Sequence, residues 1–455
     1  MGSFEIQFRT LTPLWTGGVG GDCDRLHETG IIGSLRWWYE VVVRGLGGRA
    51  CDPSDKEKAC VLDCNRYKSL RREGKSLLEP GEGAALCHAC QVFGTTGWQK
   101  LFKLEVKVDN KDGNTSLVPI VDDFTKKGLL LPSGRCPERD NKYRAGGWYI
   151  LPARYGTFTL AFHLSPRCVN ERYIQLFFAT IRLMEHWAAI AAKETSGYGV
   201  FKITESQGIP PFPEENPFSS GGNNGSGLPD LTNFFFAKVR FRTEQGKWWQ
   251  RFKEVELALD PNPPCHDKKQ QRISEEQLGN WLNSKAFPLS HIVRNWFRYT
   301  WYLKLGFHNS EEVLYFGTEK GDRRRSAIGI SHAYQLEDGL WEFRVWGYRP
   351  PGLEKKKWQQ FVAKLFDALL VPGQKGGSPM YGGSLPSIWD KPDWKEDERD
   401  GCIWHRNEGG LFGGIVKPES LVWREFRSDR DTVGNFTDKW EFFKSLVEGR
   451  ETGGA

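Results

Sequence analysis

The sequence of 455 residues lacks any apolar run near the roughly 20 residues that a membrane-spanning helix needs. Its N-terminus also lacks the basic start and apolar core of a secretory signal. Neither a phosphate-binding Walker loop nor the Gly-x-Ser-x-Gly turn of serine hydrolases is present. We therefore expect a cytoplasmic protein that makes no membrane contact and has neither of these two catalytic devices.

Excess charge of one sign is also scarce, because 63 basic and 57 acidic residues leave a net charge of +6. This balance permits nucleic-acid binding through local patches but does not require it. Glycine and large aromatics are abundant instead, with 51 Gly, 19 Trp and 29 Phe. Glycine lets the backbone approach a ligand closely, and this many aromatic side chains exceeds what a core needs. We expect some of them to face a partner.

The N-terminal stretch predicts a strand, a glycine loop and a helix. Apolar residues alternate with polar ones from Phe4 to Phe8, which is typical of a strand. After the glycine loop, apolar residues recur at helical spacing from Ile31 to Leu46. The opposite helix face carries three charged residues, Arg36, Glu40 and Arg44. The glycines at 45–48 end the helix.

The rest of the first half completes a β-α-β-β-α-β order. Strand-like alternation recurs at 104–108 and 158–164, and a helical pattern runs from about 170 to 193. A second glycine loop, ETSGYG, then leads into a last strand. This order is typical of the ferredoxin-like or RRM-like unit, an antiparallel sheet with two helices on one face.

A Pro-, Gly- and Ser-rich stretch at 208–230 reads as a linker, and the same plan then restarts. VRNWFR in the second half answers LRWWYE in the first, and Phe316-Gly317 answers Phe93-Gly94. The fold class is therefore α+β, with tandem ferredoxin-like domains at 1–207 and 231–455. The pattern leaves the last strand of the second domain unplaced in the Gly-rich segment after Pro372.

A cysteine-rich insertion at about 49–90 interrupts the first domain. Cys87 and Cys90 form a Cys-x-x-Cys knuckle, which is typical of two ligands of a tetrahedral zinc ion. Cys51 and either Cys60 or Cys64 supply the other two, and Cys51, Cys60, Cys87 and Cys90 are the set we take. Such a zinc would be structural, because four thiolates leave no open position. The alternative is free thiols on a surface insertion.

These motifs together resemble one family. TPLWTGG, ETGIIGSLRWWYE and the C-x-x-C-x-V-F-G-x-T-G-W run are similar to the RAMP superfamily of CRISPR-associated proteins. More narrowly they resemble the first-named RAMP subunit of the type III-B (Cmr) effector complex. LYFGT, RRSAIGIS and GLWEFRVWGYRP extend the resemblance into the second half.

The resemblance implies a subunit without a catalytic role at the end of a filament of backbone subunits. Its implied partners are the 3′ part of the CRISPR RNA, the matching end of single-stranded target RNA, and other Cmr subunits, notably the terminal backbone subunit. Target cutting belongs to a different subunit in that complex. The loop AAKETSGYG at 191–199 takes the place of the family's glycine loop.

The candidate RNA contacts of the first domain gather where loop meets helix. Glycine amides and the positive end of a helix suit phosphates, arginine suits phosphate or base, and an exposed tryptophan stacks on a base. Trp38 falls on the apolar face, so Trp37 is the expected RNA ligand; alternatively, Trp37 covers the joint between domains. The candidates are Trp15, Thr16, Gly17, Gly18, Arg36, Trp37, Trp98 and Lys193.

In the second domain the candidates are Arg294, Arg298 and Arg324, the middle of the run 323–325. Three consecutive arginines usually form a solvated loop. Here they follow a Phe-Gly turn, where the first domain carries Trp98 and Lys100. Contacts of this kind would neutralise phosphates without reading sequence.

Two other functions remain open. One is a metal-independent endoribonuclease that uses His27 as general acid or base, with Arg25 or Arg36 beside the phosphate; a polar residue at a helix start is the simpler interpretation. The other is a structural cap whose basic residues meet protein. The Gly20–Asp24 turn resembles a metal-binding Gly-Gly-Asp-Asp turn, but its carboxylates are split, so we interpret it as a loop. The pair His266-Asp267 is a weak candidate.

Overall fold

The structure is a computed structural model of the chain. It describes residues 2–73, 86–108, 117–119, 129–132, 138–139, 142–143, 147–151, 153–165, 171–218, 227–244, 246–259, 275–301, 309–318, 324–374, 385–392, 394–397, 403–406 and 409–453. Within these ranges no helix combines the length and the apolar character that crossing a membrane would require.

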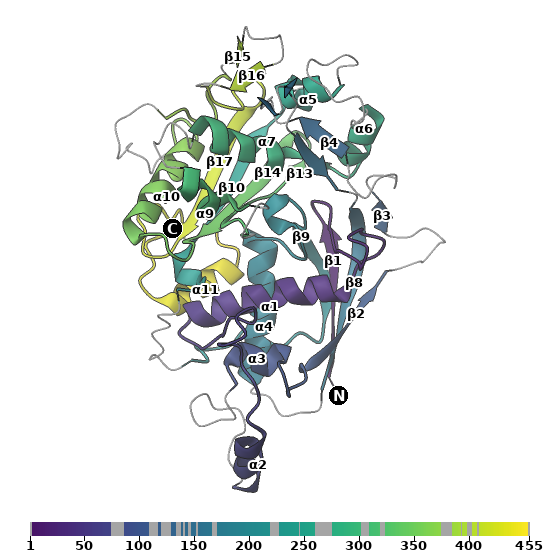
Figure 1. The fold of residues 1–455 in the computed structure, drawn as a ribbon, viewed down its shortest axis with the longest axis vertical. Helices are drawn as coiled ribbons and strands as arrows, with labels where there is room; N and C mark the ends of the chain where they lie inside the picture. Colours follow the sequence, from purple (N-terminus) through teal and green to yellow (C-terminus); the bar gives the residue numbers. More distant parts are fainter. Residues whose placement is uncertain are drawn as a thin grey trace.

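The first sheet is antiparallel and has the strand order β2 (Phe102–Lys107), β8 (Arg154–Leu164), β1 (Ser3–Thr10), β9 (Phe201–Gln207). In chain order these are the second, third, first and fourth strands of one unit. Its two helices are α1 (Glu28–Gly45) and α4 (Glu171–Trp187) (Figure 1). This strand order is that of the ferredoxin-like unit. The prediction for the first domain is therefore confirmed.

The second sheet repeats this order. Its strands run β17 (Lys417–Glu425), β10 (Phe234–Arg242), β14 (Leu340–Tyr348), with β12 (Ile328–Ile330) and β13 (Ala333–Glu337) both beside β14 and β11 (Ala286–Phe287) beyond β13. The helices are α7 (Leu289–Asn295), continued by the π-helical turn η4 (Trp296–Trp301), and α10 (Lys355–Leu369). The strand that the sequence left unplaced is β17.

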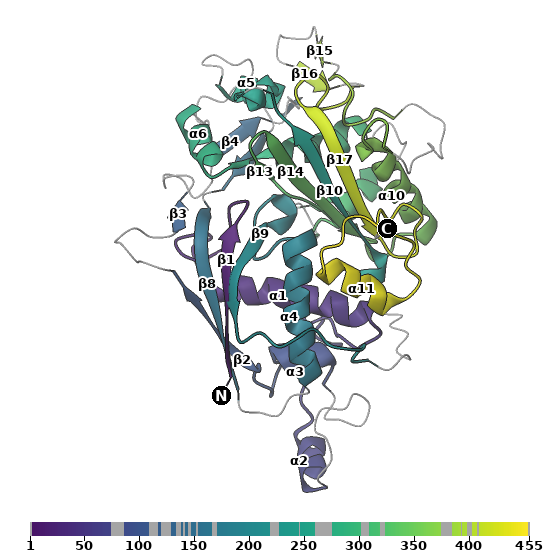
Figure 2. The ribbon, with the colours of Figure 1, turned by 180° about the vertical axis from the view of Figure 1, so that it is seen from behind.

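The two domains share one helical layer. Phe234 and Phe236 of β10 pack against Trp38 of α1, with ring centroids 5.5 and 6.2 Å apart. Arg344 of β14 donates from Nη1 to the carbonyls of Glu185 and Ala188 at the end of α4, at 2.7 and 3.0 Å. The opposite face of the second sheet packs against α7 and α10 in a separate core. The layers are therefore sheet, helices, sheet, helices (Figure 2).

Details of backbone geometry support the internal duplication. The pairing of β1 with β9 shifts register between Gln7 and Phe8, and the pairing of β10 with β17 shifts between Arg240 and Phe241. These bulges fall at equivalent places in the first strand of each domain. Gly94 and Gly317 also match, with φ of 82° and 72°, where any side chain would strike backbone atoms of the turn that follows.

Insertions decorate both domains. The cysteine-rich insertion holds α2 (Cys64–Arg72) and α3 (His88–Phe93), and α2 lies at the end of the molecule away from the second domain (Figure 1). Between β2 and β8 lie the short strands β3 (Leu117–Pro119), β4 (Leu129–Pro132), β5 (Glu138–Arg139), β6 (Lys142–Tyr143) and β7 (Gly147–Ile150). β4 pairs with β7 and contacts α5 of the second half.

The remaining elements complete the second half of the chain. They are η2 (Leu231–Asn233), η3 (Trp248–Arg251), α5 (Lys253–Leu259), α6 (Glu275–Asn283), α9 (Asn309–Phe316), β15 (Trp394–Asp397), β16 (Ile403–Arg406) and α11 (Lys439–Val447). α11 returns to the first domain, where Trp187 donates from Nε1 to the carbonyl of Leu446 at 2.8 Å. Phe442, Phe443 and Leu446 thus belong to the core around α1 and α4.

Candidate nucleic-acid interface and metal centre

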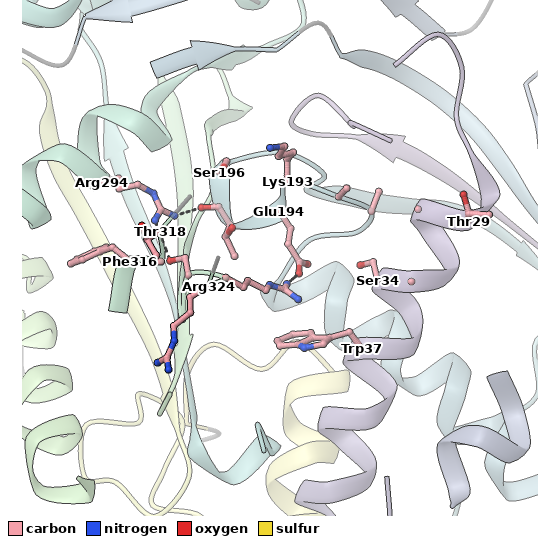
Figure 3. Close-up of a pocket in the computed structure, with 18 of the residues that line it drawn as sticks. Thr29, Ser34, Trp37, Lys193, Glu194, Ser196, Arg294, Phe316, Thr318 and Arg324 are labelled. Atoms are coloured by element: carbon pink, nitrogen blue, oxygen red, sulfur yellow. Dashed lines mark hydrogen bonds and ion pairs between the residues drawn. The ribbon is translucent and has the colours of Figure 1, made fainter. Parts of the chain in front are cut away.

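A cleft of about 790 Å³ opens between the two domains. One wall is the N-terminal part of α1, and the second is the loop 191–196 before β9. The third wall comes from the second domain and includes residues 316–318, residues 324–326 and two arginines, Arg294 and Arg298. Five predicted RNA contacts meet in this cleft, namely Trp37, Lys193, Arg294, Arg298 and Arg324. Figure 3 labels Trp37, Lys193, Arg294 and Arg324 among them.

The loop at 191–196 has a strained backbone held by its neighbours. Ala191 and Lys193 both adopt positive φ, at 73° and 61°, which costs energy for residues with a side chain. Trp15 accepts a bond from the Ala192 amide at 3.2 Å, and Gly197 accepts one from His332 at 3.0 Å. The loop keeps this conformation because both domains hold it.

Glu194 connects residues of both domains within the cleft. It is buried, and its Oε2 accepts a hydrogen bond from Trp38 Nε1 at 3.1 Å. Its other oxygen, Oε1, pairs with the guanidinium of Arg325. That guanidinium also lies over the ring of Trp37, 4.2 Å from the ring centroid. Glu194 therefore fixes Arg325 flat against Trp37, a cation–π contact between the domains.

Arg294 is buried, although it lines the cleft. It donates to Ser326 Oγ at 3.1 Å, to the Ile328 carbonyl at 3.2 Å and to the Thr195 carbonyl. Burial is the main cause that lowers its pKa. These bonds assign Arg294 to fastening the loop onto the second domain. Of the other arginines that line the cleft, Arg324 and Arg325 are exposed and Arg298 is half-buried. Arg323 and the pair His266-Asp267 lie outside the described residues.

Trp37 also contacts the second domain directly. Its ring centroid lies 6.1 Å from that of Phe234 and 5.8 Å from that of Tyr348. The alternative interpretation, in which Trp37 covers the joint between domains, therefore describes part of its surroundings. The half-buried Trp37 therefore packs against the second domain and also lies beneath the guanidinium of Arg325.

The loop that begins at Trp15 lies outside the lining of the cleft, and Trp15 only contacts residues that line it. Lys193 Nζ lies 5.6 Å from the centroid of the Trp15 ring. Thr16 is fully buried, where its hydroxyl donates to the Arg25 carbonyl at 2.9 Å and accepts from the His27 amide at 3.0 Å. Gly17 packs on the Trp15 ring, and Gly18 closes the turn with Asp22. None of the residues 16–18 lines the cleft.

His27 is bound to a neighbouring carboxylate. Its Nε2 lies 2.6 Å from Oδ1 of Asp24, and this hydrogen bond is the main cause that lowers the pKa of Asp24. His27 is the residue before α1 and its side chain makes no cap. It does not line the cleft. Arg25, the proposed helper, instead contacts Glu28 at 3.3 Å.

Arg36 and Trp98 lie on the other side of α1, beside the cysteine-rich insertion. Arg36 donates to the Gly94 carbonyl at 3.1 Å and to Cys90 Sγ at 3.3 Å. Trp98 is buried and donates from Nε1 to the Gln91 carbonyl at 3.1 Å. The structure does not bring either residue to the cleft.

The face of α1 that carries Arg36, Glu40 and Arg44 is covered by the insertion. Glu40 accepts from Arg36 Nε at 2.8 Å and pairs with Arg44 at 3.4 Å. Arg44 also donates to the carbonyls of Ala50 and Cys51, at 3.0 and 2.9 Å. The charges on this face therefore dock the insertion and are not simply solvated.

The cysteine cluster is the candidate metal centre. The sulfurs of Cys51, Cys60, Cys87 and Cys90 all lie within 4.8 Å of one another. Sγ of Cys51 is 3.5 Å from that of Cys90 and 3.7 Å from that of Cys87. Bonds of about 2.3 Å to a tetrahedral zinc would separate the sulfurs by about 3.8 Å, so the cluster fits.

Backbone amides donate to the sulfurs of the cluster. Amides of Cys51 and Cys90 donate to Cys87 Sγ, each at 3.4 Å, and the Cys87 amide donates to Cys60 Sγ at 3.4 Å. Hydrogen bonding with Cys60 is the largest cause that lowers the pKa of Cys51 to about 7, whereas hydrogen bonding with Cys51 is the largest cause that raises the pKa of Cys90. Cys64 is exposed and belongs outside the cluster. The four cysteines that the sequence singled out are therefore the ones that meet and could hold a metal ion.

Several cleft residues escaped the sequence reasoning. Ser34 and Gly33 line the cleft, one turn before Trp37 on the same side of α1. The helical spacing of 30, 33, 34 and 37 is the signal that could have found this stripe. Glu194 had no such signal, because its partners Trp38 and Arg325 lie far away in the sequence.

Comparisons with known proteins give a family match for the first half of the chain. A family model described as the RAMP superfamily matches residues 7–202. Among solved structures, the chain is similar to the apo crystal structure of Cmr1 from Pyrococcus furiosus, with 14% identity and a TM-score of 0.31 over 80% of this chain and 97% of that one. It is also similar to a chain of a type III-B Cmr-beta complex bound to cognate target RNA, with 13% identity and a TM-score of 0.34 over 81% and 99%.

No curated protein matched the sequence. The matched residues 7–202 contain residues 7–10 of β1, both helices of the first ferredoxin-like unit and the loop 191–196 of the cleft. The N-terminal domain of the chain therefore matches the RAMP superfamily.

Proposed function

We propose that this protein is a non-catalytic RNA-binding subunit of a type III-B CRISPR effector complex. In this role it contacts the 3′ part of the CRISPR RNA, the matching end of the target RNA, or both. Its other partners are the remaining Cmr subunits, with the terminal backbone subunit as the neighbour on which it docks. The motifs of both halves and the RAMP match of residues 7–202 support this assignment.

The cationic cleft is the observation that carries the proposal. Lys193, Arg298 and Arg324 contribute positive charge to a cleft between the domains. Among the described residues that line it, Glu194 is the one acid, and Arg325 neutralises it. A cleft of this kind attracts a phosphate backbone without regard to sequence, which is what a guide-binding subunit needs.

The nuclease alternative has less support. A general acid or base must reach the proton that it transfers, at about 2.6–3.2 Å. His27 lies outside the lining of the cleft, with its Nε2 on Asp24. An RNA held in the cleft would therefore meet the cations of the loop and of the second domain and would not meet this histidine.

The cysteine cluster completes the proposal with a structural zinc ion. Cys51, Cys60, Cys87 and Cys90 would hold it, and four thiolates leave no position for a substrate. The ion would tie the two ends of the insertion together beside α1. Arg36 would offset part of the negative charge of the thiolates through its bond to Cys90.

The test is incubation of the full chain with end-labelled single-stranded RNA, with and without divalent metal. A native gel reports binding, and a denaturing gel reports cleavage. We expect retarded, intact RNA whose affinity falls with salt. For Lys193→Ala, Arg298→Ala and Arg324→Ala, each change should lower the slope of log K against log salt by about 0.7.

The other outcomes identify the alternatives. Metal-independent cuts that vanish in His27→Ala would show a nuclease. No RNA binding, or binding whose salt slope ignores all three substitutions, would favour a structural cap. Lys202→Ala is the matched control, because this exposed lysine of β9 lies outside the cleft.

A further inference from the structure

Trp37 and Arg325 form a cation–π pair in the lining of the cleft. The guanidinium lies 4.2 Å from the centre of the Trp37 ring, and Glu194 fixes it from the side. The side chain of Arg325 is still 40% exposed. Because one face of the guanidinium lies on Trp37, the exposed part is open to the cleft. Guanidinium planes are surfaces on which unpaired bases stack.

The stretch of α1 beside this pair has glycines at two positions that line the cleft. Gly33 is exposed, and a Cβ built on it would meet no atom within 4 Å. Gly30, one turn earlier, also carries no side chain into the cleft. A group that lies along the helix at this place can approach the backbone closely.

A hydroxyl without a hydrogen-bond partner indicates that the group bound at this place is polar. Only 8% of Ser34 is exposed, and its Oγ has no hydrogen-bond partner among the described residues. It lines the cleft and projects from α1 toward Glu194, on the side from which Trp37 also projects (Figure 3). A buried polar group without a partner is costly, so such a hydroxyl signals a missing partner. Trp37 lies three residues along the helix, about 5–6 Å away between Cβ atoms.

From these features we propose that the cleft takes one unstacked nucleotide of single-stranded RNA. Its base stacks on the Trp37–Arg325 platform, its ribose lies along Gly33, and a ribose hydroxyl bonds to Ser34 Oγ. The flanking phosphates face Lys193, Arg298 and Arg324. This inference rests on the proposed RNA-binding function and adds to it the unit that is bound.

The site should accept any base. The platform contacts only the π-face, which all bases share. Glu194, the acid that might read a base edge, already binds Trp38 and Arg325. The cleft volume of about 790 Å³ is also within the 300–1,000 Å³ range of small-ligand sites.

The experiment compares an oligouridine with a ribose-phosphate oligomer of equal length that lacks bases. The full chain should bind the oligouridine about 5- to 150-fold more tightly, because base stacking supplies the difference. Gly33→Leu should fill the groove and displace the ribose, so it should weaken the oligouridine much more than the base-less oligomer and remove most of this preference. Ser34→Ala should weaken both oligomers by about 2- to 10-fold, because both retain the ribose hydroxyl.

Gly279→Leu is the matched control, because Gly279 also lies in a helix, α6, with no atom within 4 Å of a built Cβ. Neither leucine should lower the melting temperature. If Gly33→Leu leaves the oligouridine affinity unchanged, or weakens both oligomers equally, the nucleotide site is overturned while RNA binding stands. If the unaltered chain binds neither oligomer, the proposed function fails as well.

Discussion

At the scale of single residues, Glu451 fastens the C-terminal residues to the second sheet. Its carboxylate lies 2.7 Å from Lys238 Nζ and 2.7 Å from Arg240 Nη1, both on β10. Burial opposes its ionisation, but the hydrogen bonds and charges of these two cations outweigh burial and lower the pKa of Glu451 from 4.5 to about 2. The ionised form is therefore stabilised in the folded protein.

This shift predicts a loss of stability in acid. A carboxyl group with a lowered pKa contributes stability above its unfolded value, here 4.5, and loses it as the pH falls through about 2. The contribution above pH 4.5 is on the order of 3 kcal/mol. Glu451→Gln should therefore lower the free energy of unfolding by about this amount at neutral pH, with a gap that closes toward pH 2.

Urea unfolding of both proteins across this pH window checks the prediction. Glu448→Gln is the control, since Glu448 pairs at 2.6 Å with an Arg450 whose side chain is 52% exposed. That exposed pair should contribute little. A gap between the unaltered chain and Glu451→Gln that stays constant down to pH 2 would contradict the pKa argument.

Arg36 shows that a residue pattern does not determine which polar partner a side chain has. Its place opposite the apolar face of α1 predicts a polar environment, and this is what the structure has. The pattern cannot tell water from a polar partner, however. The Gly94 carbonyl and the Cys90 sulfur of the insertion take the place of solvent. Arg294, its counterpart in the second domain, likewise braces the turn after a Phe-Gly pair.

At the scale of elements, the proposed zinc ion predicts that the cysteine-rich insertion depends on bound metal. We expect about one zinc per chain, held by the four clustered thiolates. Cys60→Ser should lose most of this metal, because it removes one of four ligands. Trypsin should then cut the insertion faster at Arg49, Lys56 or Lys58, because the metal no longer ties its ends together.

Metal analysis and cobalt substitution measure this outcome, since cobalt bound to four thiolates gives a characteristic absorption. The exposed Cys64 offers the control, and Cys64→Ser should keep both metal and protease resistance. Equal metal content in the two variants would rule out the proposed ligand set.

The sequence predicted these elements unevenly. The strand from Phe4 to Phe8 and the helix from Ile31 follow from strong alternation and helical spacing, and β1 and α1 confirm both. The counterpart of α1 in the second domain is instead α7 followed by the π-helical turn η4. β17 escaped prediction because its buried residues cluster at 421–424, preceded by Pro418 and a bulge.

At the scale of the whole molecule, the two domains depend on each other. α1 and α4 lie between the sheets, and α11 from the end of the chain completes the core around them. Arg344 and Trp187 carry hydrogen bonds across these contacts. The proposed division into 1–207, a linker at 208–230 and 231–455 therefore separates parts that bury each other's surfaces.

This dependence predicts one cooperative unit. A chain cut at a protease site engineered into 219–226 should remain a single particle in gel filtration and unfold in one transition. A fragment of residues 1–207 should fail to pack, because Trp38 and Trp187 lose their partners on β10 and α11. Near-ultraviolet circular dichroism and dye binding report the packing. A well-folded monomeric fragment would contradict the shared core.

The sequence by itself determined the two ferredoxin-like repeats, the clustered cysteines and the RAMP resemblance. Each of these depends on local spacing or on motifs within one segment, which periodicity and ligand geometry make readable. Only the tertiary structure decided which candidates share a site. Trp37, Lys193 and Arg324 meet in the cleft, while Arg36 and Trp98 turn to the insertion on the opposite side of α1. The reason is that α1 lies between two sheets, so its two polar sides face different neighbours, and a linear pattern cannot assign them.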